Sequence, residues 1–118
     1  MQVVTSLDAV FAAMADPTRR AILARLAKGE ATVMELAEPF AMTQPAVSQH
    51  LKVLEGAGLV VSRVDGARRP RRLAAAGIDA MDQWLAMLRR GMEKSYERLD
   101  EVLASMEEPK KKRRGERT

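Results

Sequence analysis

Residues 43–60 read TQPAVSQHLKVLEGAGLV, a stretch that joins a helix-capping residue, apolar residues at helical spacing and two glycines. Thr43 is suited to cap a helix, because its hydroxyl can accept a hydrogen bond from a backbone N–H two or three residues later. Val47, Leu51 and Leu54 then recur at helical spacing, so one narrow stripe of the helix is apolar. The stretch therefore predicts an amphipathic helix, which two glycines end near residue 58.

The opposite face of this predicted helix is polar. Short amide and hydroxyl side chains near a helix start are typical of helices that read DNA bases, although an ordinary amphipathic surface helix has the same outline. On the first interpretation we assign base reading to Gln44, Ser48 and Gln49. We assign contact with the DNA backbone to Thr43 and Lys52.

Length and composition restrict the classes of protein to which the chain can belong. Its 118 residues favour one domain, and the low aromatic content of 3% suits helices better than a β-sandwich. Cysteine is absent, which excludes disulfides and thiolate metal sites. No long apolar run or signal peptide is found, so we expect a cytoplasmic protein without membrane contact.

The net charge of +4 is unevenly distributed along the chain. Residues 108–118 carry six basic and two acidic side chains, whereas residues 1–107 carry fourteen of each sign. Within that neutral part, residues 43–72 hold six basic and two acidic side chains. A positive segment around the predicted reading helix points to nucleic acid more specifically than the overall charge does. We expect the tail, 108–118, to be a disordered basic arm.

Three shorter helices are predicted before residue 43. Ser6 caps the first of them, at about residues 6–15, and Asp16 followed by Pro17 starts the second. Thr32 and Glu35 form a capping box for the third, which we expect a proline at position 39 to end. A short helix, a tight turn and a second helix with a polar outer face make a helix-turn-helix.

After residue 58 the pattern changes to that of a β-hairpin. Residues 59–64 are rich in strand formers, and Asp65-Gly66 is a strong hairpin-turn signal. Residues 68–73 would return as a strand that Pro70 confines to an edge. The hairpin is a predicted two-stranded wing with arginines that we assign to the DNA backbone rather than to solubility alone. These are Arg63, Arg68, Arg69, Arg71 and Arg72.

A long helix is predicted for about residues 78–107, after Gly77. Its apolar positions recur in steps of three or four, with one double step of four around Met92. Thirty helical residues extend about 45 Å, which exceeds the width of a small domain. A second subunit is therefore expected to cover part of this apolar stripe. The fold class is mainly α with a small β-wing, and residues 1–107 form the domain.

With these elements in order, the chain resembles the ArsR/SmtB family of winged helix-turn-helix repressors over about residues 6–107. ADPTRRAILARLAKGEATVMELAE is similar to the family's second and third helices, and TQPAVSQHLKVLEGAGLVVSRVDGARR to its recognition helix and wing. The resemblance implies a homodimer that binds an operator and blocks transcription, with an interface built from the first and last helices. The interface residues implied here are Leu7, Val10, Phe11, Met14, Met81, Leu85, Leu88 and Met92.

The chain also departs from the family pattern. Many relatives sense metals through cysteines of the third helix, which here reads MELAEPF without a thiol. Others bind zinc on the last helix, which here offers carboxylates but no histidine. We therefore predict no metal and no cofactor. Arg-Pro-Arg-Arg at 69–72 stands where relatives more often have an aromatic residue in the wing.

An enzyme is disfavoured, because Ser48 and the only histidine, His50, point about 200° apart on a helix. We interpret His50 as a packed, hydrogen-bonded structural residue. A non-specific chromatin-type protein and a protein-interaction module that uses the long helix stay open as alternatives. The sequence leaves open the operator, the inducing signal and whether transcription is repressed or activated.

Overall fold

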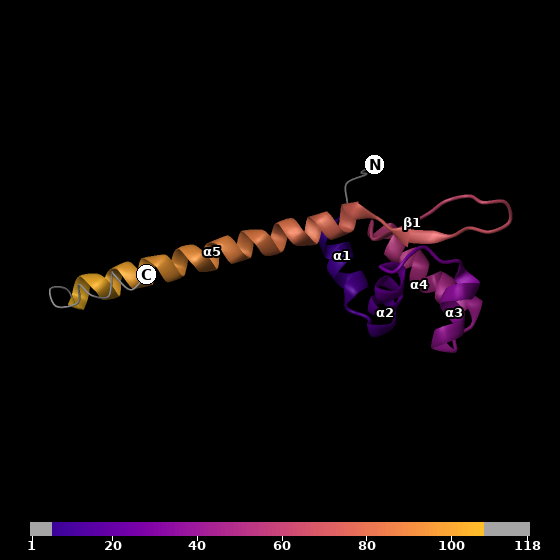
Figure 1. Cartoon of the computed structure of the whole chain (residues 1–118), viewed down its shortest axis with the longest axis horizontal. Coiled ribbons are helices and arrows are strands. Elements are labelled where there is room, and N and C mark those ends of the chain that lie inside the picture. The colour runs from indigo at the N-terminus through magenta and orange to yellow at the C-terminus, as the bar shows by residue number, and fades with distance from the viewer. Residues whose placement is uncertain (1–5, 108–118) are drawn as a thin grey trace. The chain divides into compact units, whose positions relative to one another are not determined.

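The structure is a computed structural model that describes residues 6–107; the predicted basic tail lies outside this range. The chain divides into two units, Met1–Asp82 and Gln83–Thr118, and helix α5, Ala75–Glu107, runs through the boundary. The first unit holds four more helices and one two-stranded antiparallel sheet (Figure 1). The prediction of a mainly α fold with a small β-wing is confirmed.

Helices α1, Leu7–Met14, and α2, Pro17–Leu26, begin where their caps predict. The Ser6 hydroxyl accepts from the backbone N–H of Ala9 at 3.3 Å. The Asp16 carboxylate accepts from the backbone N–H of Arg19 at 2.9 Å, and this hydrogen bond lowers the pKa of Asp16. Local side-chain chemistry therefore sets both starts.

Two arginines of α2 satisfy the carbonyl groups that α1 leaves unpaired at its end. Arg19 donates from Nε to the carbonyl oxygen of Ala13 at 2.8 Å and from Nη2 to that of Ala12 at 3.2 Å. Arg20 donates from Nη1 to the carbonyl oxygen of Met14 at 2.7 Å. Cations at a helix C-terminus also interact favourably with its dipole, so α1 and α2 are held together electrostatically.

Helix α3, Val33–Phe40, shows the predicted capping box, with Thr32 and Glu35 bonded reciprocally. The prediction that Pro39 ends this helix is wrong, because Pro39 lies within its last turn. A proline removes only its own backbone N–H, so the helix continues through Pro39 and the chain changes direction two residues later, at Ala41. Ala41 adopts a left-handed conformation with φ of 52°, and that residue ends the helix.

One hydrophobic core lies among α1 to α4 and the wing. Its largest fully buried side chains are Ile22, Leu36, Leu51, Leu54, Leu59, Val10 and Val47. Removing such a side chain to alanine typically costs about 2–5 kcal/mol. Because α3 and α4 both contribute to this core, it fixes the helix-turn-helix as a rigid unit.

Helix α5 begins at Ala75, three residues earlier than predicted, so Gly77 lies inside its first turn rather than before it. The backbone N–H of Gly77 donates to the carbonyl oxygen of Gly58 at 2.7 Å. A Cβ at position 77 would meet the carbonyl oxygens of Ala57 and Gly58 at 2.8 and 2.9 Å. Gly77 therefore serves a close backbone contact, which a pattern read along one helix does not reveal.

Candidate nucleic-acid interface

The predicted reading helix is α4, Gln44–Gly56. Thr43 caps it as expected, since its Oγ1 accepts from the backbone N–H of Ala46 at 3.2 Å. Of the two glycines predicted to stop it, Gly56 is the last helical residue and Gly58 adopts the left-handed conformation, with φ of 76°. The chain then turns into the wing.

The outer face of α4 is exposed to solvent. The inner face is buried in the core, as the sequence predicts. The four residues predicted to face DNA on this helix are all exposed: Gln44, Ser48, Gln49 and Lys52. Gln44, Ser48 and Lys52 follow one another in steps of four, so they form one line along the helix, with Gln49 beside it. The line offers amide and hydroxyl groups first and a cation last.

The wing is built from β1, Val60–Ser62, and β2, Arg71–Leu73, which pair antiparallel with Val60 opposite Leu73. The predicted turn is confirmed, because the backbone N–H of Arg68 donates to the carbonyl oxygen of Asp65 at 3.0 Å. The return strand is shorter than predicted and starts after Pro70, whose carbonyl accepts from the N–H of Arg63 at 3.1 Å. Proline has no N–H to continue the ladder.

The other edge of β2 is also paired, which the sequence analysis missed. The backbone N–H of Ala31 donates to the carbonyl oxygen of Arg71 at 3.0 Å, and the N–H of Arg71 donates back at 2.8 Å. This bridge ties the base of the wing to the segment between α2 and α3. A single bridging residue leaves no periodic signal in the sequence.

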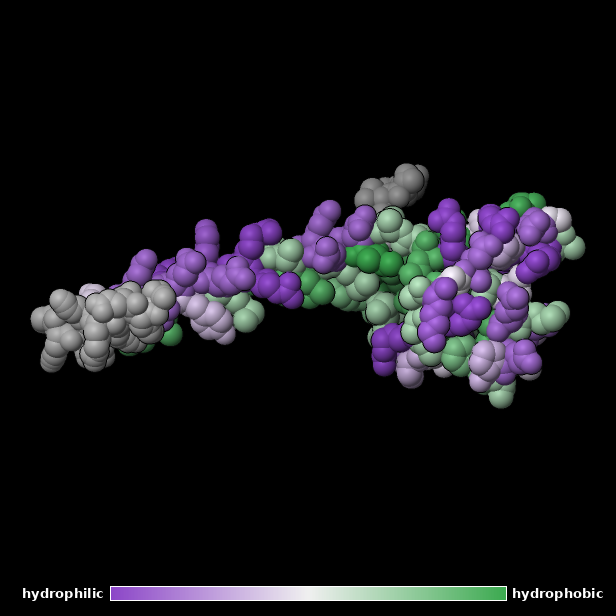
Figure 2. Space-filling view, in the orientation of Figure 1, coloured by the Kyte–Doolittle hydropathy of each residue, from purple (hydrophilic) through white to green (hydrophobic). Residues whose placement is uncertain are grey.

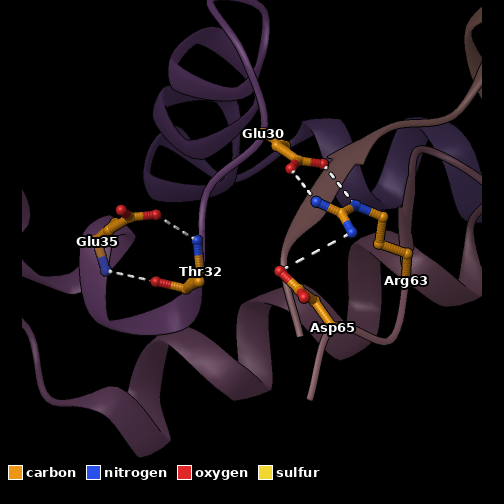
Figure 3. A network of polar contacts seen from close by, with 5 residues as sticks. All are labelled: Glu30, Thr32, Glu35, Arg63 and Asp65. Atoms are coloured by element: carbon orange, nitrogen blue, oxygen red, sulfur yellow. Dashed lines mark hydrogen bonds and ion pairs between the residues drawn. The ribbon is translucent and has the colours of Figure 1, made fainter. Parts of the chain in front are cut away.

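Arg63 is not free, because it lies in a network of carboxylates (Figure 3). Its Nε and Nη2 donate to the two carboxylate oxygens of Glu30 at 3.1 and 2.6 Å, and its Nη1 lies 4.0 Å from Asp65. This pairing lowers the pKa of Glu30 and raises that of Arg63. The bidentate geometry favours a structural role at the wing base over phosphate contact.

Arg71 is likewise held within the chain. Its Nε donates to a carboxylate oxygen of Glu55 at 3.1 Å, and its Nη1 donates to the carbonyl oxygen of Arg69 at 2.8 Å. Only 16% of the Arg71 side chain is exposed. Glu30 lies 33 residues from Arg63 and Glu55 lies 16 residues from Arg71 along the chain, so no local sequence pattern could have indicated these two pairs.

Three other arginines of the wing remain available. Arg68, Arg69 and Arg72 are exposed, and none of them forms an ion pair with a carboxylate in residues 6–107. Arg68 and Arg69 follow directly on the turn at Gly66, whose φ is 61°. The wing therefore presents exposed cations that form no ion pair within residues 6–107, two of them beside its turn and one on β2.

Of the residues assigned to a dimer interface, five lie in the first unit and three in the second. Val10 is completely buried in the intrachain core, so its side chain offers no surface to a partner, contrary to the expectation. Leu7 is half-buried, and Met14 and Met81 pack against the same core. Phe11 on α1 keeps 38% of its surface exposed.

The second unit carries the other interface residues on α5. Leu85, Leu88 and Met92 are 46%, 47% and 53% exposed in the single chain. On the visible side of this helix, hydrophilic residues line one edge and hydrophobic residues emerge along the other (Figure 2). Large apolar side chains gathered on one helical face are typical of a surface that a partner covers.

His50 contacts Arg19, as expected of a structural residue. The Nη1 of Arg19 lies 3.4 Å from Nδ1 of the half-buried His50, so this contact links α2 to α4. Among residues 6–107, no group of three or more metal-binding side chains is gathered in one place. No helix within that range is long and apolar enough to cross a membrane.

Comparison with known proteins identifies the family. Residues 16–62 match the model of the bacterial regulatory protein, arsR family. The HTH-type transcriptional regulator Rv2034 of Mycobacterium tuberculosis is 48% identical over 81 residues, which cover 69% of this chain and 76% of that protein.

Solved structures agree with this match. An ArsR family transcriptional regulator superimposes with a TM-score of 0.68 at 40% identity, covering 74% of this chain and 90% of that one. A homodimeric winged helix-turn-helix DNA-binding domain from Mycobacterium bovis gives a TM-score of 0.57 at 31% identity, covering 73% of this chain and 78% of that one. The chain therefore belongs to the arsR family of bacterial regulatory proteins, which are winged helix-turn-helix, DNA-binding regulators of transcription.

Proposed function

We propose that two copies of the chain bind one inverted repeat in double-stranded DNA and thereby repress transcription. The observation that carries this proposal is the exposed polar line on α4 beside a wing with exposed arginines that form no ion pair within residues 6–107. A dimer seated on its operator excludes other proteins from the DNA it covers, which accounts for repression. As a regulator of a bacterial chromosome, the protein would act in the cytoplasm.

Base reading is assigned to the start of α4. Gln44, Ser48 and Gln49 are exposed, carry both donors and acceptors, and lie in the first half of the helix. Major-groove base edges present distinct donor and acceptor patterns that such groups can distinguish. Lys52 and Thr43 are assigned to the DNA backbone, where a cation and a hydroxyl act without sequence choice.

Phosphate contact by the wing is assigned to Arg68, Arg69 and Arg72. Their exposure and lack of carboxylate partners among residues 6–107 support this role. Arg63 and Arg71 were also expected to contact phosphate, but their side chains are engaged by Glu30 and Glu55. In the proposal these two arginines position the wing, and the other three bind DNA.

A homodimer is supported by two observations. The Mycobacterium bovis domain with 31% identity is homodimeric. In this chain Phe11, Leu85, Leu88 and Met92 expose apolar surface on the two helices that the proposal places at the interface. A single recognition helix spans too few base pairs to mark a unique site, so a dimer also meets a functional need.

Selection from a random duplex library by the purified protein tests this proposal against its main alternative. We expect enrichment of an inverted repeat whose half-sites lie about 34–36 Å apart, or one helical turn. A library that stays random after several rounds, while the protein still binds DNA, would favour a non-specific chromatin-type protein. Failure to bind any duplex would favour a protein-interaction module.

A further inference from the structure

A cavity lies between the start of α3 and the wing. Residues 32–35 form one of its walls, and residues 67–69 together with Arg71 form the other. Its volume of about 580 Å³ falls within the range of roughly 300–1,000 Å³ that is typical of sites for small organic molecules. The proposed DNA contacts leave this space without a role, although Arg68 and Arg69 belong to both the cavity and those contacts.

The two walls of the cavity are tied together by contacts within the chain. The backbone N–H of Arg71 donates to the carbonyl oxygen of Ala31 at 2.8 Å, and Ala31 directly precedes the first wall. The ion pair between Arg63 and Glu30 joins the same two segments (Figure 3). The capping box fixes the first turn of α3. Both walls are therefore held in place before a ligand arrives, which reduces the ordering cost of binding.

Apolar side chains supply most of the surface of this cavity. On the first wall Val33 is half-buried and Met34 is 65% exposed, and on the second wall Ala67 is exposed. Sites for small molecules are typically apolar, with a few polar groups that orient the ligand. A methionine side chain is also flexible, so it adapts to the shape of what it contacts. The cavity therefore suits a ligand with an apolar body.

The charged side chains around the cavity favour a ligand with one negative charge. Arg68 and Arg69 are exposed and form no ion pair within residues 6–107, whereas Arg71 is engaged by Glu55. A backbone hydrogen bond within the capping box lowers the pKa of Glu35, and nearby Arg68 lowers that pKa further, so Glu35 is ionised at neutral pH. Three arginines against the carboxylates of Glu35 and Glu55 leave one positive charge.

We propose that this cavity binds a small organic monoanion, a carboxylate on an apolar aliphatic or aromatic body, and that the bound anion weakens binding to DNA. The guanidinium groups of Arg68 and Arg69 pair with the carboxylate, and Val33 and Met34 contact the apolar body. Because the same two arginines are the proposed phosphate contacts, the anion and the DNA backbone compete for them. The competition rests on the proposed function, whereas binding of the anion does not.

Octanoate and 2-naphthoate, each compared with its uncharged amide, test the site on the full chain without DNA. In nuclear magnetic resonance titrations at constant ionic strength, at least one carboxylate should bind at millimolar concentration or below and shift the amide signals of residues 32–35 and 67–69. Its amide should bind about tenfold more weakly, because it lacks the charge. Acetate, which lacks the apolar body, should not bind. Absence of binding by both carboxylates, equal binding of carboxylate and amide, or shifts centred elsewhere would overturn the proposal.

Two variants locate the ligand on the two walls. Arg68→Ala/Arg69→Ala should abolish the preference for the carboxylate over its amide, because the charge recognition is lost. Met34→Gln should weaken carboxylate and amide alike, by about fivefold, because it removes apolar contact. The matched control, Met106→Gln, makes the same change at a methionine of the second unit that is 72% exposed, and binding should stay as in the wild type. Undiminished binding by both cavity variants would place the ligand elsewhere and overturn the proposal.

A salt series with and without the bound carboxylate tests the competition with DNA. At a saturating concentration of the tighter carboxylate, the wild type should bind its duplex more weakly, with a salt slope shallower by about 1.8, as expected for two lost phosphate contacts. The double arginine variant should show no change on adding the carboxylate. A carboxylate that binds in the cavity but leaves the wild-type slope unchanged would overturn the competition. A chain that binds no duplex contradicts the proposed function, and the titrations without DNA then still decide whether the cavity binds the anion.

Discussion

Replacing wing arginines in matched variants separates phosphate contacts from structural ion pairs. In Arg68→Ala/Arg69→Ala, two exposed cations without carboxylate partners in residues 6–107 are removed. Each phosphate contact contributes about 0.9 to the slope of log affinity against log salt. The slope should therefore become shallower by about 1.8. Between 50 and 200 mM salt, this removes a factor of about 12 from the loss of affinity.

Arg71→Ala is the matched control, because its side chain is engaged by Glu55 and only 16% exposed. A hydrogen-bonded charge of this kind contributes roughly 1.5–3 kcal/mol when buried, and partial exposure reduces the loss to about 1 kcal/mol. For a domain of this size the melting temperature should fall by about 4–8 °C.

Fluorescence anisotropy across a salt series, with thermal unfolding followed by circular dichroism, measures both effects. The salt slope of Arg71→Ala should match that of the wild type, and the melting temperature of the double variant should be unchanged. A shallower salt slope for Arg71→Ala, together with an unchanged salt slope for the double variant, would refute the division of the wing arginines into two groups.

Three further changes test other parts of the account. Gln49→Ala should cost about 1–3 kcal/mol on the selected operator and little on random duplex in binding titrations, and an equal loss on both would exclude base reading. Leu88→Glu should place an unpaired charge in the exposed apolar face of α5 and give a monomer by sedimentation that no longer binds the operator; a variant that stays dimeric would contradict the interface. The pKa of Glu30 is lowered below its usual 4.5 by the hydrogen bond from Arg63. The contribution of Glu30 to folding stability should therefore be present at neutral pH and be lost as the pH falls below about 4.5; acid unfolding of Glu30→Gln compared with wild type measures it.

The features that the sequence predicted correctly depend on residues close together along the chain. Caps at Ser6, Asp16, Thr32 and Thr43 bond to backbone groups three residues away, so the motif itself contains both partners. The apolar positions of α5 recur at helical spacing in the same way.

The features that the sequence did not predict depend on contacts between distant residues. Gly77 marks a close approach to Gly58, and Arg63 finds its partner in Glu30. Val10 and Phe11 are neighbours on α1, yet Val10 is buried in the core and Phe11 is 38% exposed. Periodicity identifies an apolar residue but not which chain covers it, so the division between core and interface required the structure.

Hydroxyl-radical footprinting of the protein on its selected duplex tests the central claim most directly. The account predicts two protected regions related by the symmetry of an inverted repeat and about one helical turn apart, with two chains per duplex by sedimentation. One protected region with a single chain per duplex, or protection spread evenly along the DNA, would contradict it.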